Sequence, residues 1–373
     1  MCGISGLVNC GDREVLHRMT GIQAHRGPDD AGLWEKHFPD GSYVGLGSRR
    51  LAILDLSSAG HMPLANEDQS LWITFNGEIY NSPTLREELQ TKGHQFRSQT
   101  DTEVVVHLYE QYGQECVGRL NGMFAFAICD LRNNRPAVFM ARDHFGVKPF
   151  YYARTDRGVA FASEIKALLQ VPGITAEMDT EALQQYLTFL WVPDPKTIFR
   201  GISKLPAGHR ATFCDGRLNI RQYWDLTFPD RDQQYARSED DLCEEIRERF
   251  RSSVRAQMLS DVPVGAFLSA GLDSSSIVAA MAEVADRPVR TYTIAFPDKY
   301  CIGEATLDDP SVASRMAAFA GCENQRITVD ADAAALLPKL VWHMDEPTAD
   351  PALLTHTWFA GKLESHPQFC CQA

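Results

Sequence analysis

The sequence has 373 residues, of which 44% are hydrophobic and 23% are charged, an ordinary balance for a globular enzyme with more than one domain. The net charge of -13 at pH 7 argues against a nucleic-acid partner, because phosphate recognition requires a basic surface. No apolar run approaches the roughly 18 residues that span a bilayer, and the N-terminus lacks a signal-peptide pattern, so we expect no membrane partner. The cysteines are scattered, which favours reduced thiols in a cytoplasmic protein.

Cys2 is the most informative of the 10 cysteines, which include no CxxC pair and no His/Cys spacing typical of zinc. Met1 is removed readily when a small residue follows it, and Cys2 would then carry a thiol and a free α-amine. An amine with a reference pKa near ~8 can accept the thiol proton. Taken alone, however, a cysteine at this position is more often an ordinary small buried residue.

The first half of the chain is rich in strands with interspersed helices. Apolar runs predict strands at 4–8, 45–54, 71–75 and 158–162 and a hairpin of 123–130 with 137–142, and helical spacing predicts helices at 83–92, 102–112 and 164–169.

The second half has a different sequence pattern, which begins with a stretch rich in proline and charged residues. A proline-rich, charged stretch at 193–240 indicates a connecting segment between domains 1–192 and 241–373. After it, a helix from 242, a strand at 262–268, a helix at 275–285 and a strand at 289–296 are expected. This alternation continues to about 346 and is typical of a parallel α/β sheet.

Four segments of the first half, at 25–29, 50–55, 76–80 and 98–103, are short and polar, and we interpret them as loops at strand ends. Each has an ordinary structural interpretation. Asn76-Gly77 is the commonest hairpin-turn dipeptide, and Asp101 could cap the helix that begins beside it. Their value lies in their occurring together with Cys2.

In their order along the chain and in their residues, Cys2 and these loops resemble the class II glutamine amidotransferase domain, over about residues 2–169. The resemblance implies an N-terminal-nucleophile hydrolase with a four-layer αββα sandwich, in which Cys2 attacks the side-chain amide of glutamine. It implies an oxyanion hole from Asn76 and Gly77. The remaining glutamine contacts carried over are Arg50 for the α-carboxylate, Asp101 with Glu78 for the α-ammonium, Arg26 near the nucleophile, and Leu51 and Ile53 beside Arg50.

The run Phe267-Leu268-Ser269-Ala270-Gly271-Leu272-Asp273-Ser274 follows a predicted strand and opens a predicted helix. A helix N-terminus is an anion site, and no GxxxxGK[ST] motif competes with this run. The run resembles the PP-loop of ATP pyrophosphatases, with Ala270 in place of the first glycine. The resemblance implies ATP contacts from Leu268, Ser269, Gly271, Asp273, Ser274 and Ile294, with Mg²⁺ at Asp273.

Together the two halves resemble the glutamine-hydrolysing asparagine synthetase family, which implies glutamine, aspartate and ATP as partners. Family members continue well past residue 373, and the tail 361–373 lacks the family pattern. We therefore expect an incomplete parallel-sheet domain, a truncated or frame-shifted synthetase half, and glutaminase as the complete activity. Another carboxylate acceptor, an inactive remnant with a binding role, and a homo-oligomer all stay open.

Overall fold

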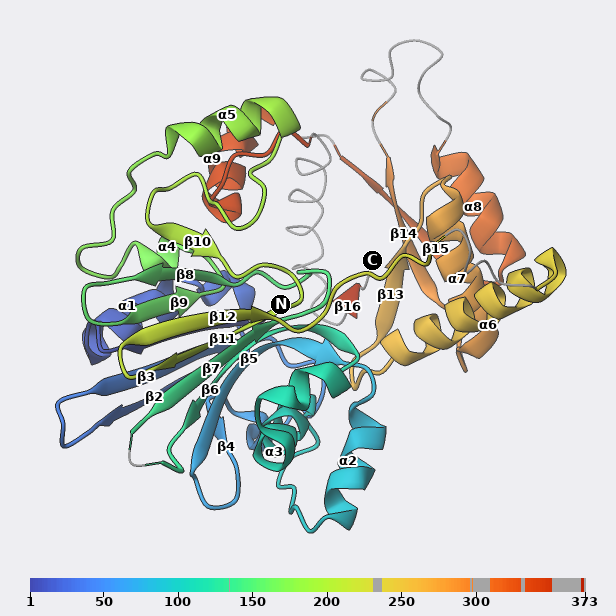
Figure 1. The fold of residues 1–373 in the computed structure, drawn as a ribbon. Helices are drawn as coiled ribbons and strands as arrows, with labels where there is room; N and C mark the ends of the chain where they lie inside the picture. Colours follow the sequence, from blue (N-terminus) through green and yellow to red (C-terminus); the bar gives the residue numbers. More distant parts are fainter. Residues whose placement is uncertain are drawn as a thin grey trace. The chain divides into compact units, whose positions relative to one another are not determined.

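The computed structural model describes residues 1–133, 135–230, 237–295, 297, 309–329, 333–350 and 370–371. The chain forms two compact units, Met1–Thr227 with Met344–Ala349, and Phe228–His343 with Asp350–Ala373 (Figure 1). Within the described ranges, no helix is both long and apolar enough to cross a membrane.

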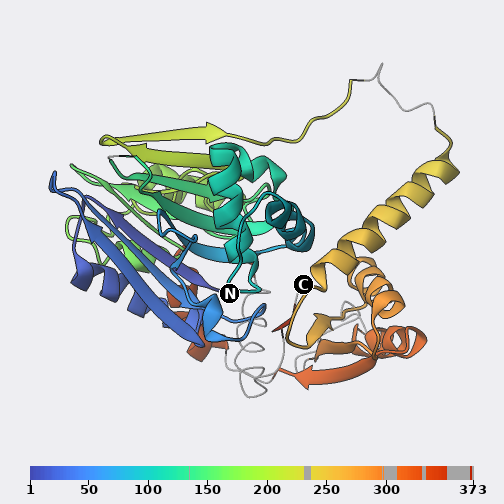
Figure 2. The same ribbon diagram turned by 90° about the horizontal axis from the view of Figure 1, so that it is seen from below.

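The first unit contains two six-stranded antiparallel sheets that lie face to face (Figure 2). One has the order β10-β8-β9-β1-β3-β2 and the other β12-β11-β7-β6-β5-β4. The strands are β1 (Gly3–Val8), β2 (Asp30–His37), β3 (Tyr43–Arg50), β4 (Leu64–Ala65), β5 (Leu71–Ile79), β6 (Gly122–Asp130), β7 (Ala137–Arg142), β8 (Tyr151–Arg154), β9 (Val159–Ala162), β10 (Ile202–Lys204), β11 (His209–Cys214) and β12 (Arg217–Gln222).

Side-chain size on strand β6 shows how the layers are built. Its small residues, Ala125, Ala127 and Cys129, pack into the core between the sheets. The alternate residues Phe124, Phe126 and Ile128 pack outward, into a core shared with helices α2 (Ser82–Thr91) and α3 (Asp101–Tyr112). Because successive side chains of a strand point to opposite faces, one sequence run serves both cores.

The other sheet is covered by helices α1 (Arg13–Ile22) and α4 (Ile165–Leu168), with Leu7 and Leu16 in the core between them. Helix layers therefore flank the two sheets on both sides. The predicted αββα sandwich is confirmed. A further helix of this unit, α5 (Thr180–Phe189), packs on a small cluster around Val192 and Ile198.

Two stretches differ from the sequence-based expectation. The strand predicted at 45–54 ends at Arg50, because the next residues form a loop around the Arg50 guanidinium. The predicted connecting segment 193–240 contributes β10, β11 and β12 to the sheets of the first unit. The prolines of this stretch favoured a loop in the sequence-based prediction, although Ala211 and Phe213 on β11 are buried at alternate positions as in a strand. The domain limits at 192 and 241 stay predictions.

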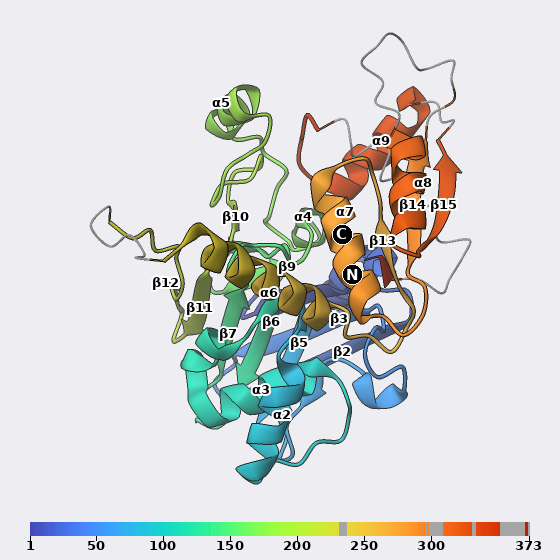
Figure 3. The same cartoon turned by 90° about the vertical axis from the view of Figure 1, so that its right-hand side faces the viewer.

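The second unit contains a parallel sheet of order β15-β14-β13-β16, as predicted for an α/β domain (Figure 3). Its strands are β13 (Val264–Phe267), β14 (Arg290–Ala295), β15 (Glu323–Thr328) and β16 (Cys370–Cys371), and its helices are α6 (Glu239–Gln257), α7 (Leu272–Val284), α8 (Asp309–Phe319) and α9 (Ala333–Met344). Val254, Ala266, Val278 and Ala313 meet in its core. Apart from residues 370 and 371, the unusual tail 361–373 lies outside the described residues.

Candidate functional site

The Cys2 thiol lies at the start of β1, against the first residue after β3. The Leu51 backbone N–H donates to Cys2 Sγ at 3.4 Å, and Sγ lies 3.7 Å from the Leu51 carbonyl oxygen. Burial raises the pKa of the Cys2 thiol, opposed by the nearby terminal ammonium and the Leu51 N–H. A thiol in this setting is protonated at rest, so it needs a base at the moment of attack.

Arg26, at the end of a 3₁₀ turn (Ala24–Arg26), begins a chain of charged contacts that leads away from Cys2. Its Nε donates to the Cys2 carbonyl oxygen at 2.9 Å, and its Nη1 lies 3.2 Å from Glu164 Oε1. Glu164 pairs with Lys166 at 2.7 Å, and Lys166 pairs with Asp345 at 2.9 Å. Asp345 belongs to the short segment Met344–Ala349 that groups with the first unit. The chain of charges fixes the backbone of the nucleophile.

Arg50 ends β3 and is buried, and its guanidinium is held by the loop that follows. Nη2 donates to the carbonyl oxygens of Leu54 at 2.9 Å and Asp55 at 2.6 Å, and Nη1 donates to that of Ser57 at 3.3 Å. A Cβ at Gly60 would lie 2.1 Å from Nη2, so a larger residue there would displace the guanidinium. The fork is therefore rigid before any ligand arrives. Ile53 is half-buried in the same loop.

Asn76, Gly77 and Glu78 lie within strand β5, so the hairpin-turn interpretation of Asn76-Gly77 is wrong. Asn76 is buried, yet neither its side-chain oxygen nor its nitrogen has a hydrogen-bond partner. A Cβ at Gly77 would lie 2.3 Å from the Met123 carbonyl oxygen on β6, which requires glycine. Residues two apart on a strand share a face, so Asn76 and Glu78 point the same way.

Asp101 is the first residue of α3, and Thr100, rather than Asp101, caps the helix by accepting from Glu103 N–H. The Asp101 carboxylate instead accepts from the Ile79 N–H at 2.8 Å, which ties α3 to the end of β5. Burial raises the pKa of Asp101 to about 6, and burial together with the Asp101 charge raises the pKa of Glu78 to about 9. Near neutral pH the pair therefore holds one negative charge.

Lys148 is a charged residue of this site that the sequence-based set omits. It is buried, burial lowers its pKa, and the charges of Glu78 and Cys2 act in the opposite direction. Its position is set by Asp143, whose carboxylate accepts from the backbone N–H groups of Val147 at 3.0 Å and Lys148 at 2.9 Å. The charged run 141–151 was visible in the sequence, but nothing local distinguished Lys148 from a surface charge.

The structure thus brings most of the predicted glutamine contacts together. Leu51 and Arg26 contact Cys2, and the charges of Glu78 and Asp101 act on its thiol. The Arg50 charge acts on Asp101. Asn76 and Gly77 belong to the same site through their strand neighbour Glu78. The group offers a thiol, a rigid guanidinium, an acidic pair and an unpaired amide.

The predicted nucleotide loop lies in the second unit between β13 and α7. Gly271 is the N-cap residue of α7, and Asp273 lies in its first turn. Ser269 and Ser274 hydroxyls lie 2.9 Å apart, and Ser269 Oγ accepts from the Gly271 N–H at 3.1 Å. The buried Leu268 donates its N–H to Tyr292 on β14, the strand that also carries Ile294. The arrangement directs hydroxyls and N–H groups to one helix N-terminus.

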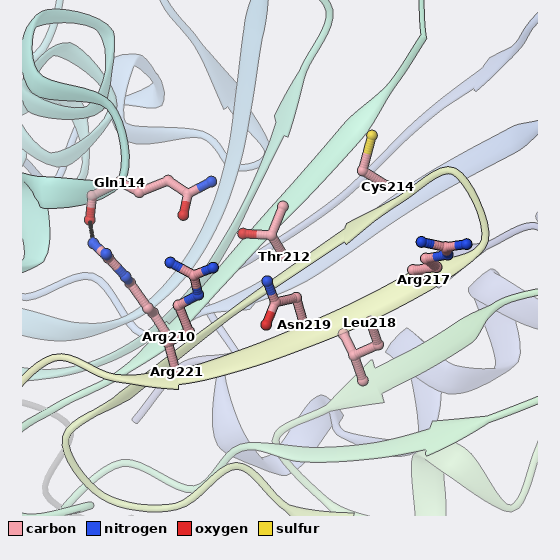
Figure 4. A pocket seen from close by; sticks show the side chains of 8 residues that line it. All are labelled: Gln114, Arg210, Thr212, Cys214, Arg217, Leu218, Asn219 and Arg221. Carbon is pink, nitrogen blue, oxygen red and sulfur yellow. Dashed lines mark hydrogen bonds between the residues drawn. The ribbon is translucent and has the colours of Figure 1, made fainter.

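A hollow of about 550 Å³ lies elsewhere on the first unit, over strands β11 and β12 (Figure 4). Arginine side chains line it, and one of them, Arg210, pairs with Glu115 at 2.7 Å. Its lining residues are Gln114, Arg210, Thr212, Cys214, Arg217, Leu218, Asn219 and Arg221. None of these belongs to the Cys2 group, so this hollow is not the predicted glutamine site.

Sequence comparison divides the chain in two. Residues 1–224 match the family model described as "Glutamine amidotransferase domain", and residues 245–368 match the one described as "Asparagine synthase". Among curated proteins, the chain is 39% identical over 375 residues to asparagine synthetase (glutamine-hydrolyzing) 1 of Bacillus subtilis, covering 98% of this chain and 56% of that protein. It is 35% identical to a provisionally named asparagine synthetase (glutamine-hydrolyzing) 2 of Methanocaldococcus jannaschii, covering 94% of this chain and 69% of that protein.

The chain therefore spans a little over half the length of the Bacillus relative. Among solved structures, it is similar to a glutamine phosphoribosylpyrophosphate amidotransferase of B. subtilis, with a TM-score of 0.46 and 14% identity. That match covers 88% of this chain and 81% of the other.

Proposed function

The chain belongs to the family of glutamine-hydrolysing asparagine synthetases, and from this premise we propose that it supports glutamine-dependent asparagine synthesis. Its first unit hydrolyses glutamine at Cys2. The observation that carries the proposal is the Cys2 thiol, held 3.4 Å from the Leu51 N–H and within the electrostatic reach of the Glu78–Asp101 pair.

Charge complementarity supports glutamine as the substrate. Free glutamine carries an α-carboxylate, an α-ammonium and a neutral side-chain amide. The Arg50 fork matches the carboxylate. The single negative charge of the Glu78–Asp101 pair matches the ammonium. The remaining group of glutamine, its side-chain amide, is then the one that the Cys2 thiol can attack.

The chemistry proceeds through a covalent thioester. After Met1 is removed, the Cys2 α-amine takes the thiol proton, and sulfur attacks the amide carbon. The oxyanion that develops there receives the Asn76 side-chain N–H and the Gly77 backbone N–H. Collapse of this intermediate breaks the C–N bond and releases ammonia with the proton taken up by the amine. Water then attacks the thioester, giving glutamate and the free thiol.

The second unit fits an ATP-binding role. Hydroxyls of Ser269 and Ser274 and the N-terminus of α7 form a cradle suited to a polyphosphate. Leu268 and Ile294 offer an apolar edge near it, and Asp273 would hold a magnesium ion that neutralises phosphate charge. When bound, ATP would supply an adenylyl group to the aspartate carboxylate with pyrophosphate as the leaving group, and ammonia would then displace AMP. Passing ammonia to that carboxylate within the protein protects it from protonation in water.

The direct test is product analysis with purified protein, glutamine, aspartate, ATP and Mg²⁺. We expect glutamate from glutamine. Asparagine, with AMP and pyrophosphate in equal amounts, would show that the second unit also completes its reaction, against the sequence-based expectation that glutaminase is the complete activity. Ammonium chloride should replace glutamine in the second reaction. Glutamate without asparagine would support the first unit alone and reject the synthetase half. No glutamate from protein that lacks Met1 would reject the proposal.

Glutamine recognition should depend on pH through Asp101. The ammonium of glutamine needs the ionised carboxylate, whose pKa burial raises to about 6. Below pH 6 Asp101 is protonated, so KM for glutamine should rise up to ~10-fold for each unit by which the pH is lowered. Above pH 6 KM should be independent of pH.

The Asp101→Asn variant should have a raised KM at every pH and lose this acid limb. Asp130→Asn is the matched control, because Asp130 is equally buried but pairs with Arg132 at 2.7 Å, outside the site. An acid limb that survives in Asp101→Asn would assign the titration to another group.

A further inference from the structure

We propose that Glu67, His94, His107 and Glu110 form a binding site for one divalent transition-metal ion, of which zinc is the natural probe. One ligand atom of each residue lies within 4.8 Å of the others. None of the four belongs to the glutamine or nucleotide groups. The site lies on the helical face of the first unit, between the turn that precedes β5, the end of α2, and α3.

The fold brings the ligands from three separate segments. Glu67 lies in the turn between β4 and β5, and His94 follows the last turn of α2. His107 and Glu110 are three residues apart on α3, so they share a helix face. Sequence inspection for local His/Cys spacing finds no zinc pattern here, because two ligands are carboxylates and the two histidines are far apart in sequence, His94 in the loop after α2 and His107 on α3.

The contacts are longer than simple ion pairs and closer to the spacing of ligand atoms around a metal, with Glu67 taking part through both carboxylate oxygens. His107 Nδ1 lies 3.4 Å from Glu67 Oε2 and 3.4 Å from Glu110 Oε2. His94 Nδ1 lies 3.6 Å from the same Glu110 oxygen and 3.8 Å from Glu67 Oε1. Charge-assisted N–H···O bonds are shorter, about 2.7–2.9 Å. A tetrahedral metal with bonds of about 2.05 Å separates its ligand atoms by roughly 3.3 Å.

The outer nitrogen of His94 has the acceptor that a metal-bound histidine requires, and that of His107 faces a carboxylate at a longer distance. Each histidine directs Nδ1 inward, so a metal there needs the proton on Nε2. His94 Nε2 lies 3.3 Å from the Gln111 side-chain oxygen, and His107 Nε2 lies 3.8 Å from the Glu103 carboxylate. The buried His107 Nε2 has no hydrogen-bond partner. The Gln111 side-chain oxygen behind the His94 ring favours the tautomer of His94 that ligates.

Burial and charge also fit a small cation. The His107 side chain is fully buried and that of His94 is 10% exposed, while those of Glu67 and Glu110 are 30% and 27% exposed. The carboxylates therefore give an ion access from solvent. Two carboxylates carry a charge of -2, which one divalent ion cancels in a partly desolvated position.

Such an ion would act on structure rather than chemistry. It would join His94 to α3 and so restrain the segment 94–101, which carries Asp101 to its place in the glutamine site. Glu67 Oε1 already accepts from the Gln95 N–H at 2.8 Å, and this bond links the turn that carries Glu67 to the same segment 94–101. We therefore expect metal binding to raise stability without being required for the thiol reaction.

Equilibrium dialysis of untagged, chelator-treated protein against zinc, with metal analysis, tests the proposal. Wild type should bind one equivalent and unfold at a temperature higher by about 5 °C in excess zinc. His94→Gln and Glu110→Gln should each weaken binding at least ~100-fold, because even outer partners are worth 10–100-fold. Matched controls on exposed helix positions, His17→Gln and Glu87→Gln, should bind as wild type.

Cobalt separates this site from the thiols. Co²⁺ held by histidine and carboxylate shows only weak visible bands, whereas thiolate ligands add intense charge-transfer absorption. If the ligand variants fold poorly, Gln111→Ala at an exposed position should still weaken binding about 10-fold. Equal affinity in wild type and ligand variants, thiolate absorption, or no uptake at micromolar zinc would overturn the proposal.

Discussion

Replacing Cys2 by alanine should abolish ammonia release from glutamine, by at least ~10³-fold in kcat. The thiol is the proposed nucleophile, and no other described cysteine is a partner of Leu51 or of the Glu78–Asp101 pair. Alanine is also small, so Met1 should be removed from the variant as it is from wild type. N-terminal mass and ammonia release, measured on the same preparations, check both points.

Cys10→Ala is the matched control. Cys10 follows the other end of β1, donates to the Val159 carbonyl oxygen at 3.3 Å, and has a pKa that burial raises to about 11. Its loss removes a similar thiol from the same strand region and should leave ammonia release unchanged. Cys2→Ala protein that retained more than a tenth of wild-type activity would exclude Cys2 as the nucleophile.

Local patterns predicted much of the first unit. Strand β6 shows why, since its unbroken apolar run is buried on both faces, with small residues toward one core and aromatic residues toward the other. Strand β11 shows the opposite case. Its alternation lies among prolines and charges, and only its pairing with β7 reveals it as part of the sheet.

The site shows the same division. Cys2, Arg50, Asn76 and Asp101 stood out because each lies in a motif short enough to see along the chain. Lys148 and the group of Glu67, His94, His107 and Glu110 did not, because their surroundings come from distant segments. Lys148 is recognised as a site residue only because the fold places it near the charges of Glu78 and Cys2. His107 is recognised as a candidate ligand only because the fold places it near Glu67. Long-range proximity is the information that local spacing lacks.

Asn76→Ala should lower kcat for glutamine hydrolysis by ~10²–10³-fold, which corresponds to about 3–4 kcal/mol, with little change in KM. The oxyanion develops only in the transition state, so its donor contributes there and not to ground-state binding. Stopped assays over a range of glutamine concentrations separate kcat from KM. A rise in KM alone would mean that Asn76 binds the substrate instead.

Stability provides a second and independent criterion. The Asn76 amide is buried without a partner, so removing it takes away no protein hydrogen bond, and the free energy of unfolding should change by less than ~1 kcal/mol. Asn66 is equally buried, but it accepts from the Leu71 N–H at 3.0 Å and donates to Ser70 Oγ at 3.2 Å. Asn66→Ala should therefore cost ~1–3 kcal/mol of stability and leave kcat intact. Burying an amide without a hydrogen-bond partner destabilises the folded protein. The unpaired Asn76 amide is explained if the oxyanion of the reaction is its hydrogen-bond partner. The opposite responses of the two asparagines would distinguish that role from a purely structural one.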